Sequence, residues 1–131
     1  MNGDCTHKIN NEKQKLMNTE NLSKENENPI LRIGAVMGSA LFNSIGEWSK
    51  NAFPDAGSIE HIIKLKHEAQ EVIEAPYDIK EYADCAIALF AAAYKADIAF
   101  FELINAIESK LEINKNRKWT KLSDGTYQHC L

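Results

Sequence analysis

Two short acidic motifs lie near the middle of the chain, and each places two carboxylates three residues apart. The first is Glu68-x-x-Glu71 and the second is Glu81-x-x-Asp84. Residues three apart share one face of an α-helix. The segment 75–78 between them contains a proline and predicts a turn, so two antiparallel helices would bring the carboxylates together. Converging acids repel one another unless cations lie between them.

Carboxylate ligands favour hard cations such as Mg²⁺ or Mn²⁺ over zinc. No histidine follows a glutamate at the Glu-x-x-His spacing of di-iron bundles. Magnesium clusters most often serve phosphate chemistry, because the ions neutralise phosphate oxygens and lower the pKa of a bound water. The two motifs therefore indicate a divalent metal centre that acts on a phosphate compound.

The alternative is that these acids are solvated residues on helix surfaces, where most charged side chains lie. Glu81 also fits a capping box with Asp78 at the start of a helix. Asp84 is harder to explain in this way, because the apolar run Cys85–Tyr94 begins at the next residue. A buried or half-buried carboxylate needs a partner, and we expect Asp84 to be such a residue.

Length and composition fit one domain with a hydrophobic core: the chain has 131 residues, of which 44% are hydrophobic. A net charge of −4 argues against nucleic acid or an anionic membrane as the main partner. The three cysteines, Cys5, Cys85 and Cys130, predict neither a disulfide framework nor a zinc motif. With no apolar signal segment at the N-terminus, these features predict a protein of the reducing cytoplasm.

The hydrophobic pattern predicts an all-α fold of four helices with short connections. Residues 1–29 are polar and set no clear period, so we expect a flexible tail followed by one domain, residues 30–131. The expected helices cover residues 30–50, 58–75, 78–96 and 98–114. Ser58 and Asp97 are the expected caps of the second and fourth helices. The third is apolar on every side from Cys85 to Tyr94, which predicts a buried central helix, and no strand-period segment is evident.

Basic and aromatic residues could hold the rest of a phosphate substrate. Four cations lie near the end of the last expected helix: Lys110, Lys115, Arg117 and Lys118. Their alternative role is to complement the helix dipole. Trp48 and Trp119 could stack on a nucleobase, although each is also a common core or rim residue.

Together, the two acidic motifs resemble the signature of the MazG-like, all-α nucleoside triphosphate pyrophosphohydrolases. That signature is Glu-Glu-x-x-Glu, a short helix break, and Glu-x-x-Asp. This sequence departs from it at the leading glutamate, where His67 stands.

Two further segments resemble the same family. With the acidic motifs, they extend the resemblance over residues 30–130. Lys110-x-x-x-Asn114-x-x-Arg117 resembles the family's Lys…Asn…Arg segment after the last helix. Trp48-Ser-x-x-Ala-Phe53 resembles the Trp…Phe segment of a branch linked to dATP and dGTP.

The resemblance implies a four-helix MazG-like bundle of antiparallel helical hairpins, assembled as a homodimer or homotetramer. It implies cleavage of a nucleoside triphosphate, such as dATP or dGTP, between the α and β phosphates, with Mg²⁺ or Mn²⁺ as cofactor. The implied metal-binding and catalytic residues are Glu68, Glu71, Glu81 and Asp84, one of which, such as Glu71, would orient the attacking water. The implied substrate-binding residues are Trp48 for the base and Lys110, Asn114 and Arg117 for the phosphates or sugar. The alternatives are a non-catalytic module that binds nucleotide and metal, and a helical interaction protein.

Overall fold

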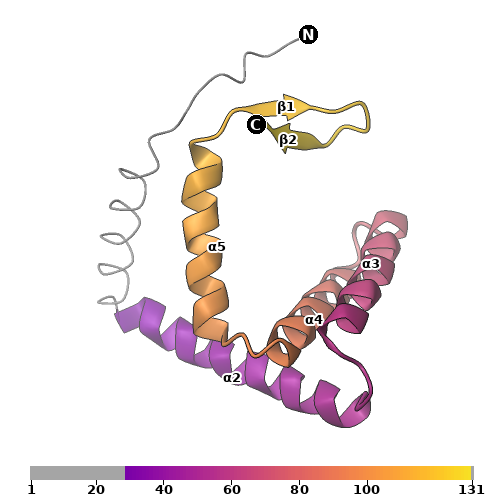
Figure 1. Ribbon diagram of the computed structural model, residues 1–131, viewed down its shortest axis with the longest axis vertical. Helices are drawn as coiled ribbons and strands as arrows, with labels where there is room; N and C mark the ends of the chain where they lie inside the picture. Colours follow the sequence, from indigo (N-terminus) through magenta and orange to yellow (C-terminus); the bar gives the residue numbers. More distant parts are fainter. Residues whose placement is uncertain (1–28, 131) are drawn as a thin grey trace. The chain divides into compact units, whose positions relative to one another are not determined.

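The computed structural model describes residues 29–130 (Figure 1). The predicted tail, residues 1–29, lies outside this range except for Pro29. The described chain falls into two compact units, residues 30–104 and a second unit that contains residues 105–130. We describe each unit by itself.

The four predicted helices are all present in the described chain, and their bounds agree with the sequence analysis to within about two residues. They are α2 (Pro29–Ala52), α3 (Ser58–Glu74), α4 (Ile79–Lys95) and α5 (Phe100–Lys115). The chain then forms an antiparallel hairpin of two strands, β1 (Trp119–Lys121) and β2 (Tyr127–His129). This hairpin was not predicted from the sequence, because a strand of three residues is too short to show a two-residue period.

Helix α3 begins after a backbone cap at Gly57, so the prediction that Ser58 is the cap was wrong. The Glu60 side chain supplies the cap, because its Oε2 accepts a hydrogen bond of 3.0 Å from the N–H of Gly57. A carboxylate there also complements the positive end of the helix dipole.

Helix α5 begins after Ala99, so the predicted cap at Asp97 was also wrong. Asp97 adopts φ = 59°, a left-handed conformation that suits a turn between helices. The N–H of Ala99 instead donates a hydrogen bond of 3.1 Å to Oε2 of Glu102. At both helices, a glutamate in the first turn satisfies a backbone N–H that the helix leaves free.

The core of the unit 30–104 is built around Phe42, whose exposed fraction is 1%. Its ring lies 5.5 Å from that of Phe90 and 5.6 Å from that of Phe100, so α2, α4 and the start of α5 meet at one side chain. Four alanines of α4 complete the buried set: Ala88, Ala91, Ala92 and Ala93. Their small side chains allow the neighbouring helices to approach closely.

Helix α4 is less buried than the sequence predicted. Leu89, within the run that is apolar on every side, is 39% exposed. Burial on every side needs cover on every side, and within one chain the neighbouring helices cover only part of α4.

The structure also bears on membrane-spanning helices and on the cysteines. Among residues 29–130, no helix is long and apolar enough to cross a membrane. Cys85 is a free thiol, whereas Cys130 is disulfide-bonded, which the cysteine pattern of the sequence did not predict.

A substitution at Gly46 would test how α2 packs against α4. It is buried, and a methyl group on its Cα would overlap the ring of Tyr94, whose hydroxyl donates a hydrogen bond to Glu47. We expect Gly46→Ala to lower the free energy of unfolding by about 1–3 kcal/mol in urea denaturation, although alanine favours a helix.

The control is the same change in a Tyr94→Ala background, where the overlapping ring is gone and the cost should largely disappear. Equal costs in both backgrounds would show that this contact does not decide the effect.

Candidate metal centre

The acidic motifs lie on a helical hairpin formed by α3 and α4, which pack side by side (Figure 1). Helix α3 stops at Glu74, and its last free carbonyls are partly satisfied by the N–H of Ala75, which donates to Glu71. Asp78 then caps α4, because its Oδ1 accepts a hydrogen bond of 2.9 Å from the N–H of Lys80. The turn is also tied by the Tyr82 hydroxyl, which donates to the carbonyl of Pro76 at 2.9 Å. The predicted turn therefore has a defined geometry.

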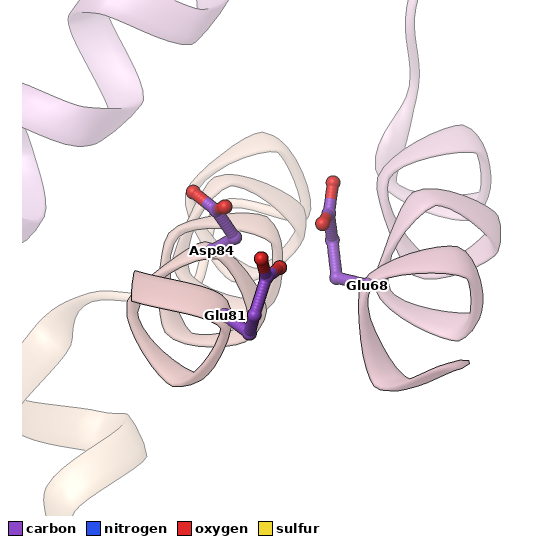
Figure 2. A group of neighbouring side chains, drawn as sticks. All are labelled: Glu68, Glu81 and Asp84. Atoms are coloured by element: carbon purple, nitrogen blue, oxygen red, sulfur yellow. The ribbon is translucent and has the colours of Figure 1, made fainter. Parts of the chain in front are cut away.

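Three of the four predicted acidic ligands gather at the contact between these helices. Glu68 on α3 faces Glu81 and Asp84 on α4 (Figure 2). Each offers one carboxylate oxygen, and the three oxygens lie within 4.8 Å of one another. The three-residue spacing on α4 places both of its acids on the side that faces α3. This is the convergence that the sequence predicted.

The buried member of this cluster is Glu68, not Asp84. Glu68 is 5% exposed, whereas Glu81 is half-buried and Asp84 is exposed. The expectation that Asp84 is buried was therefore wrong. Asp84 lies one helical turn before Ala88, and only from Ala88 onward is this side of α4 fully covered.

Burial makes Glu68 dependent on cations and hydrogen bonds, because an isolated charged carboxylate is costly to remove from water. Lys64, one turn earlier on α3, forms an ion pair with it. The hydrogen bond from Lys64, helped by one from Glu71, holds the pKa of Glu68 below its usual range. The same contact with Glu68 raises the pKa of Lys64.

Glu71 adjoins the three-oxygen cluster. It is exposed, and its carboxyl group shares a hydrogen bond with Glu68 that raises the pKa of Glu71. The nearby charge of Glu68 acts in the same direction, because two carboxylates in contact favour one shared proton. His67, which stands at the leading position of the motif, is exposed.

Glu81 is available to this cluster because it does not act in the capping box that was the alternative. In the described contacts, Asp78 caps α4 through the N–H of Lys80. The cap, Asp78, and the candidate ligand, Glu81 in the first turn of α4, are thus different residues.

The donor set fits a hard divalent cation. It consists only of carboxylate oxygens, and one carboxylate is buried, so a cation between them would offset both the repulsion and the burial. Within residues 29–130, this is the single group of three or more acidic, histidine or cysteine side chains close enough to share an ion. Mg²⁺ and Mn²⁺ are the ions that such oxygen ligands favour.

Trp48 lies at the end of α2 within a small aromatic group. Its side chain is 55% exposed, and its ring meets that of Phe53 edge to face at 5.5 Å. Phe53 in turn contacts the ring of His61, 6.4 Å away. An exposed indole held in place by a neighbouring ring could stack on a planar ligand.

A buried polar pair, which was not predicted from the sequence, lies beside these rings. The Ser49 hydroxyl lies 3.3 Å from Nε2 of His61, and both residues are buried. His61 lies between Ile59 and Ile62 in the apolar stripe of α3, and that position was the signal that could have identified it. The pair fixes the end of α2 against the start of α3.

The remaining predicted residues belong to the other unit, residues 105–130. Asn114 forms hydrogen bonds with two of its neighbours. Its Oδ1 accepts a hydrogen bond of 3.2 Å from Nη1 of Arg117, and its carbonyl accepts one of 3.0 Å from the indole N–H of Trp119. Lys110 is exposed one turn earlier on α5. Asn114, Arg117 and Trp119 thus form a fixed local group at the end of the helix.

Comparisons with known proteins show which family the chain belongs to. The family model described as dATP/dGTP pyrophosphohydrolase matches residues 41–131. A dATP/dGTP diphosphohydrolase of Salmonella phage PMBT28 is 41% identical over 88 residues, which are 66% of this chain and 29% of the relative. The chain thus spans under a third of that relative's length.

A solved structure is also similar. It is a MazG-like pyrophosphohydrolase of cyanophage S-2L, bound to dGDP and three catalytic Mn²⁺ ions per active site. It shares 30% sequence identity with this chain at a TM-score of 0.58, and the match covers 69% of this chain and 93% of that one. The resemblance inferred from the motifs is confirmed.

A cation that binds this cluster should stabilise the fold. We expect Mn²⁺ or Mg²⁺ to raise the melting temperature of the wild-type protein above its value in EDTA. At 100 times the dissociation constant, the gain would be about 2.7 kcal/mol. Glu81→Gln should remove most of this gain, because it replaces a ligand oxygen that faces Glu68.

The matched control is Glu74→Gln, since Glu74 is an exposed acid near the end of α3 whose described partner is Gln70. It should keep the wild-type response to the ion. An identical response of all three proteins would show that the ion binds elsewhere.

Proposed function

Because the chain belongs to the dATP/dGTP pyrophosphohydrolase family, we propose that it hydrolyses deoxynucleoside triphosphates, dATP and dGTP above all, to the monophosphate and pyrophosphate. The observation that carries this proposal is the acidic cluster of the α3–α4 hairpin, with a buried glutamate among three converging carboxylates. The names of the phage relative and of the cyanophage structure support the reaction and the purine deoxynucleotides.

Glu68, Glu81 and Asp84 would hold Mg²⁺ or Mn²⁺, with Glu71 beside them. The cyanophage enzyme, with three Mn²⁺ ions per active site, supports a centre of more than one ion. Bound ions would neutralise phosphate oxygens and lower the pKa of a nucleophilic water.

Glu71 is the candidate for orienting that water. It lies outside the three-oxygen cluster but touches it through Glu68, and it is exposed to solvent. A general base must lie within hydrogen-bond reach of the water that it activates, and its charged form is required. A bound cation nearby favours the charged form of a carboxylate.

The substrate would be held by the other predicted residues. Trp48 would stack on the base, supported from its edge by Phe53. Arg117 and Lys110 would contact the phosphates, because a guanidinium matches the geometry of phosphate oxygens and an ammonium adds a point charge. Asn114 would orient Arg117 through the hydrogen bond described above.

The proposed enzyme acts as a homodimer or homotetramer. Few apolar residues are buried within the described part of one chain, whereas large apolar side chains of α2 are open to solvent. Val36, Met37 and Leu41 are 70%, 69% and 60% exposed. Contiguous apolar surface of this kind marks an interface, and a second copy of the chain is the partner that the family likeness favours.

Pyrophosphate release from deoxy- and ribonucleoside triphosphates with Mg²⁺ tests the activity. We expect turnover with dATP and dGTP, and a loss of at least about 100-fold in Asp84→Asn, because the amide cannot replace the charge that the ions need. Circular dichroism should show that the exposed substitution leaves the protein folded.

Asp55→Asn, an exposed change in the loop after α2, should keep full activity. Turnover retained in Asp84→Asn would overturn the site assignment. Nucleotide binding without any product in the wild-type protein would instead indicate a non-catalytic nucleotide-binding module.

Sedimentation tests the assembly. We expect the wild-type protein to sediment as a dimer or tetramer, and Leu41→Glu to shift it towards the monomer, because the charge would be buried in the apolar interface. Asn43→Glu, on another side of α2 and exposed, should leave the assembly intact. A monomeric wild-type protein at micromolar concentration would contradict this proposal.

A further inference from the structure

The ion pair between Lys64 and Glu68 has a second role that follows from its position. We propose that Lys64 is the counter-ion of the metal-free centre, that a divalent cation displaces it from Glu68, and that its released ammonium then binds phosphate oxygens of the nucleotide. This inference rests on the proposed metal centre but assigns a role to a residue outside the motifs.

The pair differs from an ordinary ion pair on a helix surface. The side chain of Glu68 is 6% exposed, whereas that of Lys64 is 60% exposed. Exposed pairs four residues apart add little to the stability of a helix, and a lysine before a glutamate is the less favourable order. The contact is therefore explained by the need of a buried carboxylate for a cation, more than by the stability of the helix.

Lys64 interacts with the whole cluster. Besides its contact with Glu68, it is attracted by the charges of Glu71 and Asp84. Its ammonium thus lies in the field of the same acids that would hold a divalent ion. The ammonium and the ion carry charge of the same sign, so they repel each other and compete for Glu68.

Once displaced, the Lys64 side chain is free to move through solvent and can bind the phosphate of the nucleotide. Most of Lys64 is already in solvent, and its four-carbon stem lets the ammonium swing away while the backbone of α3 stays fixed. A nucleotide bound on the ions would place phosphate oxygens beside the cluster. The lysine would then exchange one oxygen partner, the carboxylate, for another, the phosphate.

Melting experiments separate this role from a structural one. In EDTA, Lys64→Gln should melt at least about 4 °C below the wild type, because Glu68 loses its cation. With saturating Mn²⁺, the difference should largely close, since the ion replaces the ammonium. Lys64→Arg should behave as the wild type in EDTA.

Binding experiments test the competition directly. Titration calorimetry with Mn²⁺ alone should show about fivefold to tenfold tighter binding to Lys64→Gln than to the wild type, because a competing charge is gone. With Mn²⁺ saturating, an α,β-non-hydrolysable dGTP analogue should bind about tenfold more weakly to the same variant. Lys66→Gln is the matched control, because Lys66 is exposed on another side of α3, and it should change neither affinity.

Opposite effects on metal and nucleotide are the signature of the proposed exchange. Unchanged or weaker Mn²⁺ binding by Lys64→Gln would overturn the competition, and unchanged analogue binding would overturn the phosphate contact. A melting difference that persists in Mn²⁺ would show that the lysine is a structural residue only. A wild-type protein that binds no Mn²⁺ would overturn the metal centre itself, and this inference with it.

Discussion

The centre depends on one constraint: the carboxylate of Glu68 is buried at the contact between α3 and α4, where charge is tolerated only beside a cation. In the described structure, Lys64 supplies that cation. Glu81 and Asp84 face the same carboxylate across the helix contact, so repulsion among the three carboxylates also favours a cation between them. A site that must attract cations to be stable is well suited to bind divalent ions.

The helical hairpin holds these groups in place with few specific contacts. Asp78 caps the second helix, and the Tyr82 hydroxyl ties the turn to the carbonyl of Pro76. The aromatic group around Phe42 joins this hairpin to α2 and to the start of α5. The small core of the described residues and the exposed apolar side chains of α2 are the observations that support the proposed assembly with a second copy of the chain.

Glu68 and Asp84 differ in burial in a way that the sequence does not reveal. Asp84 looked like the buried acid because it precedes a run of apolar residues, yet it is exposed and Glu68 is buried. An apolar run says that a helix has buried sides, but not how far along the helix its neighbours extend. The pairing of Glu68 with Lys64 was equally hidden, because two charges one turn apart are usually a surface feature.

The sequence by itself determined the four helices, the turn between the acidic motifs and the set of carboxylates, because these follow from local periodicity, from proline and from residue spacing. It also indicated the family, through the order and spacing of its motifs, and the family model that matches residues 41–131 confirms it. Only the tertiary structure decided which carboxylate is buried, that Glu60 and Glu102 cap α3 and α5, and that Ser49 pairs with His61. These features depend on contacts between residues brought together by packing or by the exact path of a turn, which hydrophobic periodicity does not encode. Glu68 shows the same division. Its place in the motif made it a candidate ligand, but only the packing of α4 against α3 buries its carboxylate and so makes it require a cation.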